Sequence, residues 1–363
     1  MRCAFERGGA AIAPLLQPSR CCMITRMKLV GFAFATLLPA LLLIPGGIWG
    51  GGWIWAALIS ITLLWLFMDR LTALAPKPGD FPAGDELLVV LGIMQGTHLL
   101  LALYALTHTL AGVDWVAGLI AFGLFFGQVG NPVAHELIHR SDRWLSRLGQ
   151  AIYIAFLFGH HISAHRLVHH THVGTPKDPN SARRGMGVWR FLPRAWIGSF
   201  RAGYAAEQAL RTRSGGVRRN PYPVYLLGAA VCLSIAFVLF GWPGPLIYVI
   251  LAAHTQSQLL VSDYVQHYGL RRKLQPSGRY EAVTARHSWN AVGWYSSAMM
   301  LNAPRHSDHH AHPSRPYPHL VLPDDAPLLP APLPAMAVLA LFPPLWRRVM
   351  DPRLPDGRPL APT

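Results

Sequence analysis

The sequence predicts an all-α integral membrane protein, folded as a bundle of six transmembrane helices. Hydrophobic residues make up 52% of the 363 residues and charged residues only 13%, whereas charged residues are about a quarter of an ordinary soluble domain. Six apolar stretches have the length needed to cross a bilayer, which is about 17–25 helical residues. The turns after the first, third and fifth stretches contain no lysine or arginine, a distribution typical of membrane proteins.

Residues 1–26 precede the predicted spans and carry scattered arginines in a stretch rich in glycine, alanine and proline. We interpret them as a disordered tail or an over-extended start, and residues 27–363 as a single membrane domain. The six predicted spans are residues 29–49, 53–71, 87–110, 115–134, 224–240 and 246–262.

Glycine, proline and charged residues delimit these elements. Proline and glycine at 45–47 separate the first two spans, and a Gly-Trp-Pro-Gly-Pro run at 241–245 separates the last two. The link at 70–86 is polar and basic. Residues 150–158 and 335–346 are apolar but too short to span, so we expect them to pack at the membrane interface or against the bundle.

Lysine and arginine are concentrated in three segments, 70–86, 140–223 and 266–363. With six spans these segments lie on one side of the membrane, together with the amino terminus. The positive-inside rule makes that side cytoplasmic. The net charge of +15 is therefore explained by topology, and we predict no nucleic-acid partner.

Histidines at metal-ligand spacing follow the predicted cytoplasmic ends of the spans. His135 and His139 lie four residues apart, as do His165 and His169, and this spacing puts each pair on one helical face. His170 is expected to point to the adjacent side. The nine candidate metal ligands are His135, His139, His165, His169, His170, His267, His306, His309 and His310.

The segment HELIH at 135–139 also matches the HExxH signature of zinc proteases, in which Glu136 would be the general base. A catalytic zinc takes only three protein ligands and a water. Nine histidines instead suit two ions with four or five ligands each. A membrane zinc protease and a non-catalytic metal-binding protein remain as alternatives from a different class.

Other polar residues are expected around the ligands. Carboxylates often accept the outer N–H of a metal-bound imidazole, and the neighbouring residues predicted to surround the ligands are Glu136, Asp263, Asp308, His172 and His312. His98 and His108 stand alone in the third span and are left outside the metal site. The candidate liners of a substrate path are Trp55, Trp65 and Phe125.

An all-imidazole site above apolar spans suits the activation of O2 against a lipid-soluble substrate. Iron is the natural metal for this chemistry, since zinc does not change oxidation state. Copper is compatible with the same imidazole ligands.

Four segments resemble the membrane alkane monooxygenases, a family within the membrane fatty-acid desaturase/hydroxylase superfamily. They are HELIHR at 135–140, HxxxHH at 165–170 with TPKDP at 175–179, HYG at 267–269, and RHSDHHAHPSRPY at 305–317. The likeness covers nearly everything after residue 27. The three residues inside HxxxHH and the HYG triplet favour the hydroxylase branch over the desaturases.

The resemblance implies two non-haem iron ions held by these histidines on the cytoplasmic side of a bacterial inner membrane. It implies O2-dependent hydroxylation of a terminal C–H bond, most simply of a medium- to long-chain alkane, to the primary alcohol. It also implies rubredoxin, reduced by an NAD(P)H-dependent reductase, as the electron donor. The chain itself has no CxxC pair and no nucleotide-binding fingerprint. The alternatives are a methyl-group hydroxylase of aromatic or terpenoid substrates and a fatty-acid desaturase/hydroxylase.

The chain departs from the usual family pattern at positions between the ligands. Ala164 and Val168 stand where the family usually has Glu and Gly, and Asp263 and Gln266 stand where it has Asn and Glu. The lead-in at 302–304 also differs. No ligand histidine is lost, so the departures bear on the surroundings of the metals and on the substrate.

Overall fold

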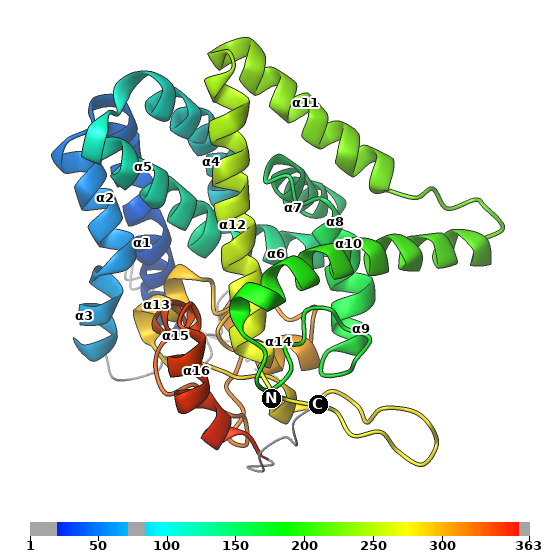
Figure 1. Cartoon of the computed structure of the whole chain (residues 1–363). Coiled ribbons are helices and arrows are strands. Elements are labelled where there is room, and N and C mark those ends of the chain that lie inside the picture. The colour runs from blue at the N-terminus through cyan, green and yellow to red at the C-terminus, as the bar shows by residue number, and fades with distance from the viewer. Residues whose placement is uncertain (1–19, 72–83, 356–363) are drawn as a thin grey trace, which may run out of the picture.

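The computed structural model describes residues 20–71 and 84–355, which form a bundle of helices joined by loops (Figure 1). Within them, extended segments meet only at isolated bridges, Leu274 with Tyr280 and Asn290 with Leu328. Residues 1–19 of the predicted tail lie outside the described residues. Residues 20–26 form the beginning of the first helix, α1 (Arg20–Trp49).

Helices form at the positions of all six predicted spans. They are α1; α2 (Gly52–Thr62) with α3 (Leu64–Leu71); α4 (Asp85–Tyr104) with η1 (Ala105–Thr109); α5 (Gly112–Phe125) with η2 (Phe126–Gly130) and α6 (Asn131–His139); α11 (Tyr222–Phe240); and α12 (Pro243–His267). By length and composition, four described helical segments can cross a membrane: Leu29–Trp49, Asp85–Thr109, Gly112–His139 and Tyr222–Phe240. The pair α2 and α3, bent by 43°, makes a fifth candidate.

Helix α12 occupies the place of the sixth predicted span but is not among these candidates. Its length is sufficient, at 25 residues. Polar side chains such as His254, Gln258 and Asp263 lower its hydropathy. The helix stands in the middle of the bundle (Figure 1), where it packs against α5, α11 and α15. The polar residues therefore belong to a helix that is largely enclosed by protein.

The turn between α1 and α2 is tied to the start of α5. Gly50 and Gly51 have positive φ angles of 66° and 56°, a conformation that glycine adopts without strain. The Gly51 N–H and the Trp55 indole N–H both donate to the Asp114 carboxylate, each at 2.9 Å. Trp55, a predicted liner of the substrate path, lies in the first turn of α2 and makes this contact with Asp114.

Two side chains that the sequence analysis named in the third and fourth spans, His98 and Phe125, lie in the core. Phe125 is buried, with its ring 5.8 Å from Phe126 and 5.1 Å from His98. The two ring nitrogens of His98 each lie 2.9 Å from a backbone carbonyl, of Met94 and of Ala40, and so tie α4 to α1. His98 is thus structural, in agreement with its exclusion from the metal site.

The segment between the fourth and fifth spans is more helical than predicted. Residues 150–155 of the expected interfacial segment 150–158 are the second half of α7 (Arg143–Ala155), whose start is capped by Asp142, and residues 156–158 follow its end. A helix of 26 residues, α10 (Val188–Arg213), follows the histidine-rich α8 (His160–Ala164), η3 (His165–His169) and α9 (His170–His172). The buried face of α10 includes the small residues Ala195, Ser199 and Gly203. These residues give little hydrophobic signal, so the sequence analysis missed the helix.

The carboxyl-terminal part of the chain lies around the carboxyl end of α12 (Figure 1). It comprises η4 (Ala285–His287), α13 (Trp294–Met299), α14 (His306–Ala311), η5 (Tyr317–His319), α15 (Leu333–Ala340), α16 (Pro343–Met350) and η6 (Asp351–Arg353). The predicted packing segment 335–346 is the pair α15 and α16, in which α15 packs against α12 and Trp346 of α16 is fully buried.

Gly149 lets α7 approach α6 closely. A Cβ atom at Gly149 would lie 2.7 Å from the Leu137 Cβ and 2.9 Å from the Ala134 carbonyl oxygen. We expect Gly149→Ala to lower the free energy of unfolding by about 1–3 kcal/mol, because the two helices must move apart. The thermal midpoint in detergent measures this change.

Gly96→Ala is the matched control, since a Cβ atom at this position of α4 meets nothing within 4 Å. Alanine is a better helix former than glycine by about 1 kcal/mol, so this midpoint should be unchanged or slightly raised. Equal midpoints for the two variants would contradict the close contact at Gly149.

Candidate metal centre

The nine histidines singled out in the sequence converge in two adjacent groups. The five-histidine group comprises His135, His139, His165, His170 and His309, and the four-histidine group comprises His169, His267, His306 and His310. Within each group the candidate ligand atoms all lie within 4.8 Å of one another. The residues come from α6, η3, α9, α12 and α14, so the centre exists only in the folded chain.

Helical spacing explains how α6 and α14 contribute. His135 and His139 are one turn apart on α6, and their ring centroids are 5.0 Å apart. On α14, His306 and His310 are also one turn apart and belong to the four-histidine group. His309 projects from a different side of the helix into the five-histidine group. One short helix therefore contributes to both groups.

The middle histidine box differs from the expected pairing because its backbone forms a π-turn. In η3 the His170 N–H donates to the His165 carbonyl, an i→i+5 bond. This wider turn places residues five positions apart close together, so His165 and His170 meet with 2.9 Å between their Nε2 atoms. His169 is directed to the other group. His165 and His169, which an α-helix would place on one face, thus belong to different groups, although their ring centroids are only 5.4 Å apart.

The distances between ring nitrogens fit bound metal ions. In the five-histidine group the Nε2 atoms of His165 lie 3.1 Å from His139 and 2.9 Å from His170. In the four-histidine group the Nε2 atoms of His306 lie 2.9 Å from His267 and 3.1 Å from His310. Two nitrogens bound at right angles to one ion, each at about 2.1 Å, are about 3.0 Å apart.

Hydrogen bonding cannot by itself explain these contacts. A neutral imidazole has one donor and one acceptor nitrogen, yet the Nε2 atom of His165 meets two other Nε2 atoms. The Nε2 atom of His169, which faces the four-histidine group, is buried without a partner among the described residues. Several converging nitrogens satisfied by one cation account for this arrangement, so the residues fit a metal-binding role.

Burial favours the neutral form of most of these rings. Desolvation, and then the neighbouring histidines, hold the pKa of each of four rings well below its ordinary value: His165, His306, His309 and His310. Metal ligation requires the neutral imidazole. At neutral pH these side chains are therefore already in the form that binds a metal ion.

His169 is held by a carboxylate that the sequence analysis did not select. Its Nδ1 atom lies 2.9 Å from Asp178 Oδ2, and both side chains are buried. Burial alone would lower the pKa of His169, but the Asp178 carboxylate outweighs it and raises that pKa. This contact directs the His169 Nε2 atom towards its group, as carboxylates commonly do for metal-bound imidazoles. Asp178 lies within the TPKDP segment, nine residues after His169, so the spacing alone gave no signal for it.

The carboxylates predicted to orient the ligand rings have other partners. Glu136 accepts from the Tyr317 N–H at 3.1 Å, and Asp263 accepts from the Asn180 amide at 2.7 Å. Asp308 binds His312, Arg315 and the backbone of Val321. For Glu136 and Asp308 the reason is helical geometry, because each adjoins a candidate ligand in the sequence, and adjacent residues of a helix with 3.6 residues per turn point about 100° apart. These carboxylates hold the loops around the centre in place.

The two histidines expected near the ligands lie outside both groups. His312 has an exposed ring that contacts Asp308 at 3.0 Å. His172 is half-buried, and its carbonyl accepts from the Thr175 hydroxyl.

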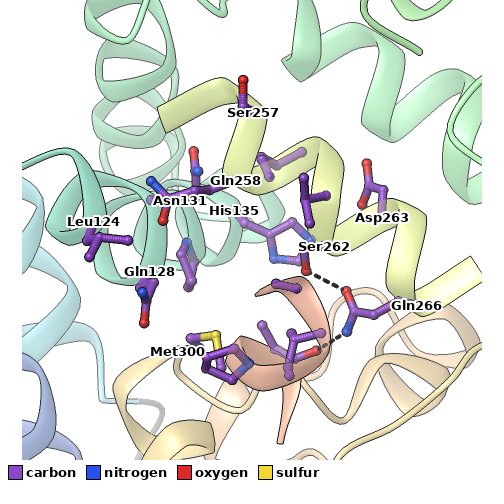
Figure 2. A pocket seen from close by; sticks show the side chains of 18 of the residues that line it. Leu124, Gln128, Asn131, His135, Ser257, Gln258, Ser262, Asp263, Gln266 and Met300 are labelled. Carbon is purple, nitrogen blue, oxygen red and sulfur yellow. Dashed lines mark hydrogen bonds between the residues drawn. The ribbon is translucent and has the colours of Figure 1, made fainter. Parts of the chain in front are cut away.

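A cavity of about 410 Å³ adjoins both groups (Figure 2). His135, His165 and His306 are part of its wall. Trp65, a predicted liner, is also part of it, together with apolar residues such as Leu124, Leu259, Met300 and Val338. Asp263, which was expected near the ligands, lines the cavity as well. The sequence analysis missed the other polar liners on α12 and its neighbours, which Figure 2 labels: Gln128, Asn131, Ser257, Gln258, Ser262 and Gln266.

A comparison with models of protein families identifies the broad class of protein to which the chain belongs. Residues 114–331 match the family model described as fatty acid desaturase. This range contains all nine histidines and the helices that carry them.

Full-length relatives then define the family. The chain is 33% identical over 323 residues to alkane 1-monooxygenase 1 of Pseudomonas aeruginosa, with 83% of each chain covered. It is 36% identical over 248 residues to alkane 1-monooxygenase 2 of the same organism, with 66% of each covered. A xylene/toluene monooxygenase hydroxylase component of Pseudomonas putida is 27% identical over 330 residues, covering 86% of this chain and 85% of the relative. The chain belongs to the alkane 1-monooxygenase family.

Proposed function

We propose that this protein is a membrane di-iron monooxygenase that hydroxylates a terminal C–H bond of an apolar substrate, most simply a medium- to long-chain alkane, to the primary alcohol. The observation that carries the proposal is the pair of histidine groups beside a cavity of about 410 Å³. The names of the relatives, alkane 1-monooxygenases, support the alkane as substrate.

In this proposal the five-histidine group holds one iron ion and the four-histidine group holds the other. Two bound iron ions would supply the redox chemistry that activates O2, for which imidazole ligands are suitable. The overall reaction consumes one O2, two electrons and two protons for each C–H bond, and yields the alcohol and one water. Since the chain has neither a CxxC pair nor a nucleotide fingerprint, both electrons must come from another protein.

The protein residues position the reactants. His135, His165 and His306 line the cavity, so a substrate carbon within it lies beside both groups. Apolar liners such as Trp65 and Leu124 exclude water from the chain of the substrate. Asp178 keeps His169 in one tautomer, with the Nε2 atom free to ligate.

The proposal includes the predicted topology: residues 27–363 as one domain with six spans in a bacterial inner membrane, and the histidine groups on the cytoplasmic side. Helix α12 would be the sixth span, its polar residues being tolerated because they face the interior and a cavity. The concentration of lysine and arginine in 140–223 and 266–363, which flank the histidine boxes, supports this orientation.

We further propose rubredoxin, reduced by an NAD(P)H-dependent reductase, as the electron donor. The exposed side chain of Arg166 stands in the same turn as His165 and His169, and Lys177 and Lys273 are exposed on nearby loops. Positive charge close to the centre would steer an acidic protein to it. Turnover with rubredoxin should then fall steeply with added salt, and Arg166→Glu should raise the KM for rubredoxin. A salt-independent rate would contradict this choice of donor.

The decisive test of the function uses cells that express the chain with rubredoxin and its reductase, fed alkanes, xylenes and fatty acids under isotopically labelled O2. Labelled primary alcohols from alkanes are the expected result. Unlabelled, unsaturated products would identify a desaturase instead. Purified protein containing one zinc and no iron would favour the protease alternative.

A methyl-group hydroxylase of aromatic or terpenoid substrates is the second candidate function. The relative named as a xylene/toluene monooxygenase component favours it, because its similarity covers 86% of this chain. In the same experiment, labelled benzylic alcohols from xylene without alkane products would decide for this candidate.

A further inference from the structure

One wall of the cavity is polar, although the rest of its lining is apolar. Helix α12 lines the cavity with Ser257, Gln258, Ser262 and other polar side chains (Figure 2). The facing residues from α3, α5 and α15, such as Trp65, Leu124 and Val338, are apolar. The hydroxyls of Ser257 and Ser262 have partners within the chain, the Ala253 carbonyl and the Gln266 amide oxygen. The buried amide oxygens of Gln128 and Asn131 have none among the described residues, a plain alkane offers them none, and unsatisfied buried polar groups are costly.

Two glycines that face α12, one in α5 and one in η2, leave room for this polar wall. A Cβ atom at Gly123 would lie 2.0 Å from the His254 Nδ1, and one at Gly127 would lie 2.1 Å from the Gln258 amide. Gly123 and Gly127 are one helical turn apart, and so are His254 and Gln258. Each glycine therefore faces one of the two polar side chains. Any larger residue at 123 or 127 would displace the polar side chains from their places.

The orientation of the Gln258 amide is set by a hydrogen bond. Its Nε2 atom donates to the Gly123 carbonyl at 2.8 Å, so its oxygen is the atom left to accept. On the adjoining η2 and α6, the buried amide oxygens of Gln128 and Asn131 also lack a partner among the described residues. The Asn131 amide nitrogen donates to the Thr255 carbonyl at 2.9 Å. This part of the wall is therefore rich in acceptors.

The polar wall stands at a distance from the metal centre. Gln258 precedes His267 by nine residues on α12, which is about 13 Å of helix at 1.5 Å per residue. Gly127, over which the Gln258 amide lies, precedes His135 by eight residues, a similar distance. A substrate of medium chain length can thus place one end beside the histidine groups and the other beside Gln258.

We propose that the cavity is built for an amphiphilic substrate, an apolar chain that carries a hydroxyl group at the end remote from the reacting methyl group. Gln258 accepts a hydrogen bond from this hydroxyl, and His254 lies one turn further out as a second polar contact. The inference rests on the proposed function and names its substrate class. It assigns Gln258 as a specificity-determining residue.

The test uses three probes of equal chain length: decane, a decane chain that ends in a tertiary alcohol, and the methyl ether of that alcohol. The tertiary alcohol cannot be mistaken for the primary alcohol product, and the ether cannot donate a hydrogen bond. Decane and the alcohol compete in one vessel, where the product ratio gives the ratio of their kcat/KM values. We expect wild-type protein to prefer the alcohol, and Gln258→Leu to reduce that preference about tenfold through loss of one hydrogen bond.

Gln150→Leu is the matched control, because Gln150 is a glutamine on α7 that bonds to Ser146 and does not line the cavity. It should leave the product ratio unchanged. A wild-type preference for decane, or the same ratio in Gln258→Leu as in wild type, would overturn the proposal.

A binding measurement separates this proposal from the proposed function. The alcohol should raise the thermal midpoint of the iron-loaded wild-type protein more than the ether or decane does, and Gln258→Leu should abolish the difference. This result would support the hydroxyl site even if no probe were turned over, in which case only the proposed function would fail. Equal stabilisation by alcohol and ether would show that the wall serves another purpose, such as holding water, and would refute the site.

Discussion

Replacing His309 with alanine is expected to abolish hydroxylation and to lower the iron content from the proposed two ions to about one per chain. His309 is buried, and its Nε2 atom lies 3.1 Å from that of His170. Its ring centroid is 4.4 Å from that of His135. Since it is the contribution of α14 to the five-histidine group, its loss opens that group while the four-histidine group remains complete. Activity should fall by more than about 100-fold, the upper range for residues that only support a ligand.

Metal analysis of purified protein measures the first effect, and alcohol formation measures the second. His312→Ala is the matched control, because His312 lies on the same short segment but has an exposed ring outside both groups. It should retain both iron ions. Full iron content and activity in His309→Ala would refute the assignment of this ligand.

Asp178→Ala is expected to lower iron affinity and activity by about 10–100-fold, although Asp178 is not itself in either histidine group. The carboxylate fixes the His169 ring through Nδ1 and also accepts from the Ser181 hydroxyl at 2.6 Å and the Asn180 N–H at 3.0 Å. Without it, the His169 ring is free to turn or to change tautomer. Asp178→Asn, which keeps an acceptor at the same place, should have a smaller effect.

Competition with a chelator of known affinity measures the iron affinity of each variant, and circular dichroism of the metal-free proteins checks that they are folded. Asp325→Asn is a suitable control, since this exposed carboxylate contacts only the exposed Arg286 among the described residues. If Asp178→Ala and Asp325→Asn bind iron equally well, Asp178 does not orient the ligand.

Much of the helical framework could be predicted because its signals are local. A stretch of apolar residues, such as 29–49 or 224–240, identifies its own helix through its length and hydropathy. Helix α10 could not be found in this way, because the buried positions Ala195, Ser199 and Gly203 are small. Their burial is decided by the neighbouring α8 and α12, against which α10 packs.

The candidate site shows the same division. Spacing in the chain was enough to select nine histidines, because ligands four residues apart, such as His135 and His139, share a helical face wherever that helix lies. Spacing was not enough to pair His165 with His170, since that depends on a π-turn. It also led to Glu136, Asp263 and Asp308 as the supporting carboxylates, whereas the folded chain uses Asp178 for His169.

By itself, the sequence determined that this is an all-helical membrane protein of the alkane 1-monooxygenase family, with nine histidines as its candidate metal ligands. Hydropathy and helical spacing are properties of short segments, and they persist whatever surrounds them. Only the tertiary structure divided the histidines into groups of five and four, and only it placed the polar side of α12 along a cavity. Both arrangements depend on contacts between residues more than a hundred positions apart, such as His309 with His170 and Gln258 with Gly123, and packing of the whole chain decides such contacts.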